Sequence, residues 1–471
     1  MNDDGVRLGV LEGPTQLEDH VISQLLELDR THWLHPLGDL GAPPGSTPQL
    51  LFTRGEGATL QDAGGRTYID AMASLWNVNV GYGRERLAAA AAEQMRTLAF
   101  SSAYGGFGHE PGIRLAARLA ELAPGNLEAT FFASGGAEAN DTAYKLARLY
   151  WKRRGRPGKI QIVSRLRDYH GLTLGAMSAT GIPVFWKDFD PLSPGFLHAP
   201  APDPYRFQPN TDGQSAGTAY ARALEDVIVK AGPETVAAVV VEPVQGAGGV
   251  VVPPPDYLPQ VRAICNRYDV LLIDDEVITG FGRTGRWFAV EHWDVVPDLM
   301  IFAKGVTSGY LPLSGVMISH EVYETLRTQK GTLAHGFTYS GHPTACAVAL
   351  ENLRLIEEER LVERVAVAGR RLLPRLDQLK RHRIVGDVRG IGLLAGVEFV
   401  SNQETRAPFD PAIGVARQVW LEALADGVIF RPLTGDVLAI CPPFVISDEQ
   451  IDVVARVLDG AIERVANRLA G

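Results

Sequence analysis

Lys304 stands between an apolar run at residues 299–303 and a loop rich in Gly, Ser and Thr. A lysine at the end of a buried strand is partly removed from water. This lowers the pKa of the ammonium group and leaves a neutral amine that can bond covalently to a carbonyl carbon. The alternative is an ordinary lysine with a buried stem and a charged end in solvent. The motif alone leaves both interpretations open.

Three consecutive acids, residues 274–276, follow an apolar run at residues 271–273. Ligands of open α/β sheets bind beyond the carboxyl ends of the strands, so a carboxylate at this place can take part in chemistry. Gly280, Gly282 and Gly285 have the spacing of a dinucleotide-binding fingerprint. In that fingerprint the glycines follow the strand directly and open a helix, which is not the pattern here. We therefore expect no dinucleotide site.

Two further stretches could bind parts of a flat, phosphorylated ligand. Small residues at 133–137 separate a strand pattern from a helix pattern, and they would let backbone N–H groups approach a phosphate at the positive end of the helix. Residues 168–171 place an aromatic ring and a glycine after another strand, where the ring could cover a flat ligand. Taken singly, the first also fits a plain turn and the second a packed aromatic residue.

These residues need a scaffold, and the sequence predicts an α/β fold with a mostly parallel sheet covered by helices. Short runs rich in Val and Ile, apolar almost throughout, are typical of strands that are buried on both faces. They lie at residues 129–133, 160–164, 236–241, 270–273, 299–303 and 315–319. Helical periodicity at residues 140–153, 218–231 and 257–268 separates several of them, and such alternation is typical of α/β layers.

The pattern changes after about residue 342, where longer helices and short strands predict a smaller α+β domain. Ser447 and Gln450 have the spacing of a capping box that opens a last helix. A turn at Gly64 and Gly65 predicts an N-terminal hairpin. We expect a large domain at residues 76–342 and a small domain built from residues 1–75 and 343–471.

Composition excludes several classes of protein. The 471 residues carry a formal net charge of −10, which argues against general nucleic-acid binding. Three distant cysteines predict buried thiols and no disulfide framework. The N-terminus lacks the pattern of a secretory signal, and the apolar runs are far shorter than the ~20 residues of a membrane span. His32 and His35 have metal-ligand spacing but no third ligand nearby. We expect a cytoplasmic enzyme without a metal and without membrane association.

Taken together, the motifs closely resemble those of the class III (ω-) aminotransferases of pyridoxal-5′-phosphate (PLP) fold type I. The resemblance extends from about Asp29 to Leu469. It is carried by residues 275–285, by residues 303–305 and by residues 336–343. Lys304 lies 29 residues after Asp275, a separation that the family leads us to expect.

The resemblance implies a binding site for the cofactor ring. Lys304 would hold PLP as a Schiff base, and Asp275 would pair with the pyridine nitrogen and keep it protonated. Val277 would pack against one face of the ring and Tyr169 against the other, with His170 beside it.

The resemblance also implies contacts around the phosphate and the ring edge. Gly136 and Ala137 would offer backbone N–H groups to the phosphate, and Glu242 would lie near the ring. Family members usually carry Ser or Thr at the position of Ala137, so a hydroxyl contact is missing here, for which Ser134 could compensate.

Four more residues concern the partner subunit and the substrate. By the same resemblance, Phe337 and Thr338 would reach the phosphate of the neighbouring subunit, which implies a homodimer with active sites at the interface and leaves a tetramer open. Trp76 would line the substrate pocket, as in amine:pyruvate enzymes. Arg431 would be the mobile arginine that binds a substrate carboxylate.

The activity implied is a ping-pong transfer of an amino group from a primary amine or ω-amino acid to a keto acid, with pyruvate as the expected acceptor. The alternative is another PLP reaction on the same fold, such as that of an aminomutase, racemase or decarboxylase. A requirement for a second substrate separates the two, because an isomerase needs none.

Overall fold

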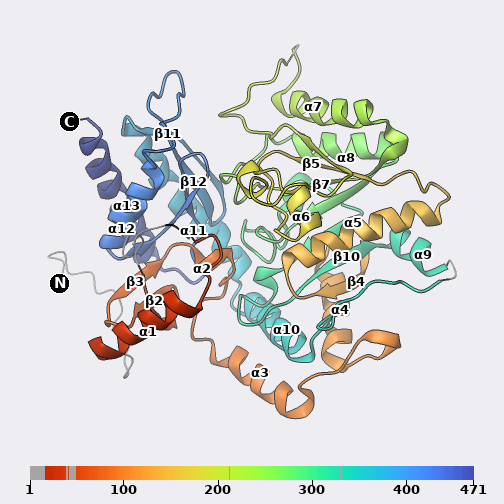
Figure 1. Cartoon of the computed structure of the whole chain (residues 1–471), viewed down its shortest axis with the longest axis horizontal. Helices are drawn as coiled ribbons and strands as arrows, with labels where there is room; N and C mark the ends of the chain where they lie inside the picture. Colours follow the sequence, from red (N-terminus) through yellow and green to blue (C-terminus); the bar gives the residue numbers. More distant parts are fainter. Residues whose placement is uncertain (1–15, 39–40, 42–48, 212, 329–330, 471) are drawn as a thin grey trace.

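A seven-stranded sheet forms the centre of the larger part of the molecule (Figure 1). The computed structural model describes residues 16–38, 41, 49–211, 213–328 and 331–470. The strand order is β4-β10-β9-β8-β7-β5-β6, and only β10 runs antiparallel to its neighbours. The strands are β4 (Leu127–Ala133), β5 (Gln161–Arg165), β6 (Phe196–Ala199), β7 (Val236–Val241), β8 (Leu271–Asp275), β9 (Leu299–Phe302) and β10 (Ser314–Ser319). The predicted fold class is confirmed.

Helices cover both faces of this sheet. One face packs against α5 (Gly136–Arg153), α6 (Leu174–Ala179) and α9 (His320–Thr328), the other against α7 (Ala216–Ala231) and α8 (Tyr257–Arg267). Within β8, Leu271 and Ile273 join the apolar cluster of α5, whereas Leu272 joins that of α8. Because both faces are buried, these strands are apolar without alternation.

Two four-stranded sheets form the other part of the molecule. The first has the order β1-β2-β3-β13 and the second the order β11-β12-β15-β14. The strands are β1 (Phe52–Glu56), β2 (Thr59–Asp62), β3 (Thr67–Asp70), β11 (Val385–Ile391), β12 (Leu394–Phe399), β13 (Val428–Ile429), β14 (Arg431–Leu433) and β15 (Val437–Ile440). Strands β2 and β3 form the expected hairpin, and β3 pairs in parallel with β13. N-terminal and C-terminal segments therefore share one sheet.

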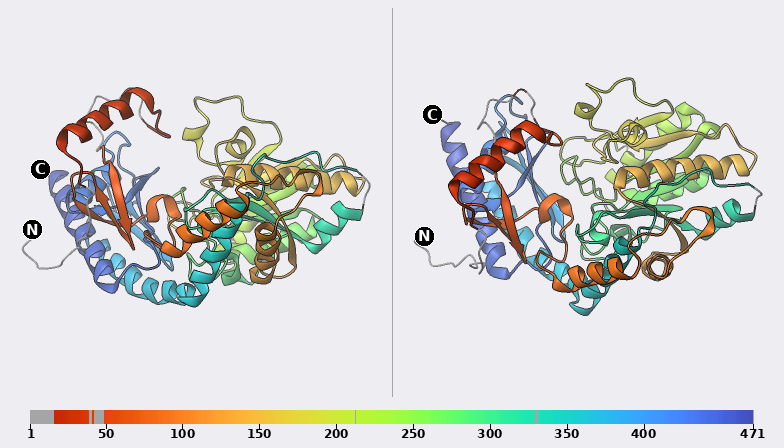
Figure 2. Two further views of the ribbon diagram at one scale, coloured as in Figure 1. Left: turned by 90° about the horizontal axis from the view of Figure 1, so that it is seen from below. Right: turned by 60° about the horizontal axis from the view of Figure 1, so that its bottom comes forward.

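The remaining helices pack around these sheets and between them (Figure 2). They are α1 (Asp19–His32), α2 (Ala73–Trp76), α3 (Glu85–Leu98), α4 (Glu110–Leu122), α10 (Pro343–Glu358), α11 (Leu361–Asp377), α12 (Val415–Ala425) and α13 (Asp448–Arg468). Helix α10 contacts α3, α4 and α11. The capping box of α13 is confirmed, since Ser447 Oγ accepts from Gln450 N and Gln450 Oε1 accepts from Ser447 N. No helix of the described residues is long and apolar enough to span a bilayer.

Candidate active site

Lys304 and Asp275 lie at the carboxyl ends of two neighbouring parallel strands. Asp275 is the last residue of β8 and pairs with Ile301 of β9, and Lys304 begins the short 3₁₀ turn η5 (Lys304–Val306) soon after β9 ends. Lys304 has a φ of 45°, a left-handed conformation that residues other than glycine rarely adopt. Conformations of this kind persist only where the surrounding structure enforces them, and they cluster at functional sites.

The environment of Lys304 favours a neutral amine. Burial lowers the pKa of Lys304, and the carboxylates of Asp275 and Glu242 oppose this only in part. Among the described residues, none forms a hydrogen bond or an ion pair with the side-chain nitrogen of Lys304, a residue that is half-buried. A desolvated and unpartnered amine is suited to covalent attachment to a carbonyl group.

Three donors fix the carboxylate of Asp275. Asn140 Nδ2 donates to Oδ2 at 2.9 Å, and His170 Nδ1 lies 2.8 Å from the same oxygen. The backbone N–H of Val277 donates to Oδ1 at 3.1 Å. These three contacts fix the orientation of the buried carboxylate.

Glu242 lies against the segment that carries Tyr169. Its Oε2 accepts from Tyr169 N at 2.7 Å, and its Oε1 accepts from Gly246 N at 3.1 Å. Burial, with a smaller contribution from the Asp168 carboxylate, raises the pKa of Glu242 to about 8. Glu242 is therefore mostly protonated at neutral pH.

The N-terminus of α5 offers a cradle for an anion. Gly135 caps this 18-residue helix in an extended conformation, and no side chain of the described residues caps its first turn. An added Cβ at Gly136 would lie 3.2 Å from Val277, so the backbone here packs closely against the strand-end loop. At Gly171 an added Cβ would lie 2.4 Å from the Cβ of Ala137. The two loops predicted to bind cofactor are therefore in direct contact.

Arg431 approaches this region from the other part of the molecule. Arg431 lies in β14, where burial lowers the pKa of its guanidinium, and it is close enough to Tyr169 to lower the pKa of that phenol against the larger effect of burial. None of the described carboxylates pairs with Arg431. Trp76 is buried at 3% exposure in α2, whose residues Ala73, Ser74 and Trp76 all have positive φ.

Phe337 and Thr338 are not brought to Lys304 of the same chain by any described contact. They lie in the loop before α10, where Phe337 N donates to Ser340 Oγ at 3.1 Å and Thr338 is exposed. His335 anchors the loop, with Nε2 2.8 Å from Thr142 Oγ1. Their predicted contact with a partner subunit remains a prediction.

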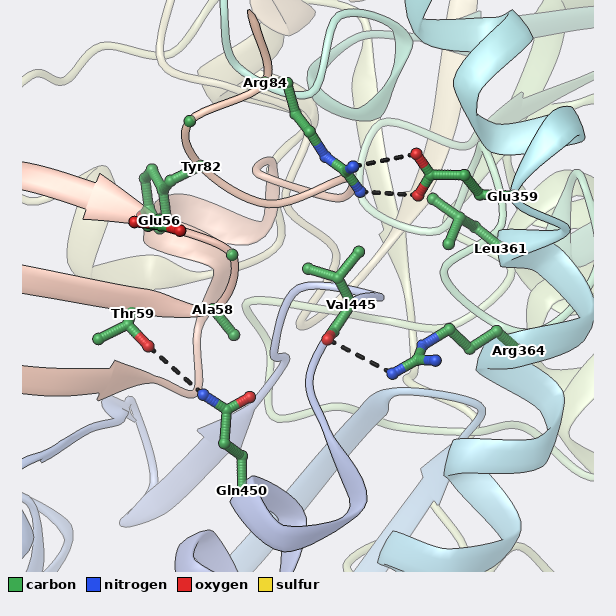
Figure 3. A pocket seen from close by; sticks show the side chains of 12 residues that line it. Glu56, Ala58, Thr59, Tyr82, Arg84, Glu359, Leu361, Arg364, Val445 and Gln450 are labelled. Carbon is green, nitrogen blue, oxygen red and sulfur yellow. Dashed lines mark hydrogen bonds and ion pairs between the residues drawn. The ribbon is translucent and has the colours of Figure 1, made fainter. Parts of the chain in front are cut away.

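A separate pocket of about 680 Å³ lies between the β1–β2 hairpin and the start of α11 (Figure 3). Its charged groups are already paired: Arg84 forms two hydrogen bonds with Glu359, and Arg364 donates to the backbone carbonyl of Phe444. None of the predicted site residues lines it. We assign it no chemistry.

Sequence reasoning missed three residues of the site: Asn140, Arg165 and Gln245. The sequence indicated Asn140 only as the first residue of a helix, yet it donates to Asp275. Arg165 and Gln245 both donate to Asp168, which the sequence showed only as a neighbour of Tyr169. The order Arg165, Asp168 and His170 at a strand end was the available signal.

Comparisons with known proteins point to one enzyme family. A family model described as aminotransferase class-III matches residues 41–462. The chain is 41% identical over 441 residues to the putrescine–pyruvate aminotransferase of Pseudomonas aeruginosa, covering 93% of this chain and 96% of that protein. Among solved structures, a transaminase from the marine bacterium Virgibacillus has a TM-score of 0.90 at 47% identity, covering 95% of this chain and 100% of that chain. An amine transaminase from an uncultivated Pseudomonas species, described as PLP-bound, has a TM-score of 0.87 at 37% identity, covering 92% and 98%.

Proposed function

This chain belongs to the class-III aminotransferases, and on that premise we propose that it moves an amino group from a primary amine or ω-amino acid to pyruvate in a ping-pong reaction. Enzymes of this family depend on PLP. The observation that carries the proposal is the unpartnered amine of Lys304 beside the carboxylate of Asp275, at the ends of adjacent strands.

The residues present fit PLP. Lys304 offers the amine that would hold the cofactor, and Asp275 offers a buried anion for the pyridine nitrogen. The free N–H groups at Gly136 and Ala137 suit a phosphate, because a helix N-terminus attracts anions. The missing hydroxyl at Ala137 leaves this contact to the backbone.

Bound PLP supplies an electron sink that stabilises the carbanion formed when a substrate carbon loses its proton. Asp275 holds a proton on the pyridine nitrogen by charge pairing. The amine of Lys304 would act as the base that takes the proton from the substrate carbon and as the acid that delivers it again. Burial helps this role because it lowers the pKa of the amine and so favours its unprotonated form.

One pocket must accept both an uncharged amine and a keto acid, and Arg431 would bind the carboxylate of the keto acid. A guanidinium facing an apolar amine is costly to desolvate, whereas bidentate pairing with a carboxylate is favourable. The absence of an ion pair to Arg431 among the described residues supports a side chain that can move between these situations.

The substitution Arg431→Ala tests this role. We expect it to slow turnover of pyruvate by at least about tenfold, the order of one charge-assisted hydrogen bond, and to spare the half-reaction of an uncharged amine. The two half-reactions control for each other. Equal losses in both would contradict the assignment.

A requirement for two substrates tests the reaction type. The purified protein with PLP, a diamine and pyruvate should form L-alanine, and omitting either substrate should stop product formation. A product formed from a single substrate would instead indicate an isomerase or a decarboxylase.

We also propose a homodimer, supported by large apolar side chains that the single chain leaves exposed. Tyr104, Phe107, Ile113, Leu174 and Tyr339 are each more than half exposed. Exposed apolar side chains commonly mark a protein interface where they gather in one patch. Phe337 and Thr338 lie beside Tyr339, so a partner seated here would meet the loop that is expected to complete its phosphate site.

A further inference from the structure

His170 lies between two carboxylates beneath the candidate cofactor site. Its Nδ1 is 2.8 Å from Asp275 Oδ2, and its Nε2 is 3.8 Å from Asp168 Oδ2. All three residues are buried, with His170 at 2% exposure and Asp168 at 0%. The ring of His170 therefore connects Asp275, which has a role in the proposed reaction, with Asp168, which has none.

The surroundings of Nε2 determine the charge of this ring. No described residue forms a hydrogen bond with Nε2. A neutral ring that donates from Nδ1 would point the lone pair of Nε2 toward the Asp168 carboxylate, and that contact is repulsive. A proton on Nε2 turns the same contact into an attraction.

Asp168 is itself held as an anion. Arg165 Nε and Nη2 donate to its two oxygens, each at 2.8 Å, and Gln245 Nε2 donates to Oδ1 at 2.7 Å. Bidentate pairing of this kind fixes the carboxylate in both position and charge. Arg165, at 0% exposure, also donates to the backbone carbonyl of Glu242. The result is a buried row of alternating charges: Arg165, Asp168, His170, Asp275.

We propose that Asp168 is a positioning residue, which holds His170 as an imidazolium and through it keeps Asp275 an oriented anion toward the cofactor nitrogen. The inference rests on the proposed function, because this row of charges orients Asp275 for a reaction only if a pyridine nitrogen faces that carboxylate. Asp168 acts through His170 and does not touch the reacting atoms.

The electrostatics of the site agree with this geometry. Burial lowers the pKa of His170, but the carboxylates of Asp168 and Asp275 outweigh it and raise this pKa to about 10. Two other titratable groups face the region. Glu242 is mostly protonated below its pKa of about 8, and burial together with the positive charge of His170 lowers the pKa of His198. Neither removes the charge from the imidazolium.

The first experiment uses the unaltered protein. The chain has eleven histidines, and ¹⁵N-histidine NMR distinguishes a ring with two N–H groups from a neutral one. At about pH 9, well above the usual histidine pKa of roughly 6.5, one histidine alone should remain doubly protonated. Loss of that signal in His170→Gln would assign it. Eleven neutral rings at this pH would overturn the proposal.

The second experiment removes the charge of Asp168 with little change of shape. In Asp168→Asn the doubly protonated signal should disappear near neutral pH, and PLP should bind more weakly by about tenfold to a hundredfold, the range for outer partners of a site. Asp203→Asn is the matched control, since Asp203 is a buried partner of Arg167 with no contact to His170. The control should keep both the signal and the affinity.

The outcomes separate this inference from the proposed function. Asp168→Asn that keeps the imidazolium, or that binds PLP as well as Asp203→Asn does, would overturn the inference. If Asp168→Asn fails to fold, the ¹⁵N spectrum of the unaltered protein still tests whether His170 is an imidazolium, and a neutral ring would overturn the inference. A protein that gains no yellow band with added PLP would overturn the proposed function, whereas a yellow protein with a neutral His170 would overturn only the inference.

Discussion

At the scale of single residues, the two central groups are held in different ways. Burial lowers the pKa of Lys304, whereas Asn140 and His170 hold the carboxylate of Asp275 in one orientation. The pair therefore provides a desolvated amine beside a fixed carboxylate. Such preorganisation costs nothing at the moment of reaction.

Asp275→Asn tests the value of the anion. The amide keeps the shape but cannot pair with a protonated pyridine nitrogen. We expect kcat to fall by about two to three orders of magnitude, as when one electrostatic contact to developing charge is lost. Turnover of a saturating amine with pyruvate gives the number, with the thermal midpoint as control for folding. A loss of kcat below about tenfold would contradict the role proposed for Asp275.

Glu242 gives a prediction about pH. Burial raises its folded-state pKa to about 8, above the ordinary value of 4.5, so the folded protein binds the proton more tightly than the unfolded chain does. The stability due to this carboxyl is present in full below pH 4.5 and is lost as pH rises through about 8. In the cofactor-free protein, the unfolding midpoints of wild type and Glu242→Gln should therefore diverge between these pH values, because wild type loses stability as pH rises. Parallel curves would contradict the raised pKa.

At the scale of elements, close contacts join the two predicted cofactor loops. Gly171 has a φ of 117°, and an added Cβ would meet Ala137 at 2.4 Å. Gly171→Ala should destabilise the protein by about 1–3 kcal/mol and weaken PLP binding. Gly435→Ala is the control, because its φ of 83° is equally unfavourable but nothing lies within 4 Å. Equal effects in denaturant unfolding and in PLP affinity would show that the contact is unimportant.

Most elements of the large sheet could be predicted from the sequence, because their strands are buried on both faces and read as apolar runs. Strand β6 escaped notice, since its four residues lie at the sheet edge and three of them are half-buried. The composition of β10 does not indicate its antiparallel direction. The left-handed residues of α2 were also missed. Asp70 supports that turn by accepting from Met72 N and Ser74 N.

The residues of the site likewise divide into those that the sequence predicts and those that it does not. Lys304 could be located because it directly follows an apolar run, and Asp275 because it is one of three acids after another such run, from which the family resemblance selects it. The support of Asp275 could not, because it joins distant parts of the chain: Asn140 lies 135 positions from Asp275, and Gln245 lies 77 from Asp168. Periodicity and local motifs carry no information on such contacts.

At the scale of the whole molecule, the proposed homodimer predicts that two chains contribute to each site. Lys304→Ala and Thr338→Glu should each be inactive as pure proteins, the second because a carboxylate beside the phosphate repels it. If each site combines Lys304 of one chain with Thr338 of the other, random mixing restores one intact site in half of the dimers. Activity should recover to about a quarter of wild type. No recovery after verified mixing would place both residues in one chain's site.

Lys304 is proposed to hold a cofactor that accepts and returns an amino group. The most direct measurement is the visible spectrum of the purified protein during a half-reaction, first with L-alanine alone and then with pyruvate. We predict that the yellow band bleaches with alanine and returns with pyruvate, and that Lys304→Ala shows neither change. A yellow protein whose band is unaffected by alanine would contradict pyruvate-linked transamination, and a protein without the band after PLP is added would contradict the role of Lys304 itself.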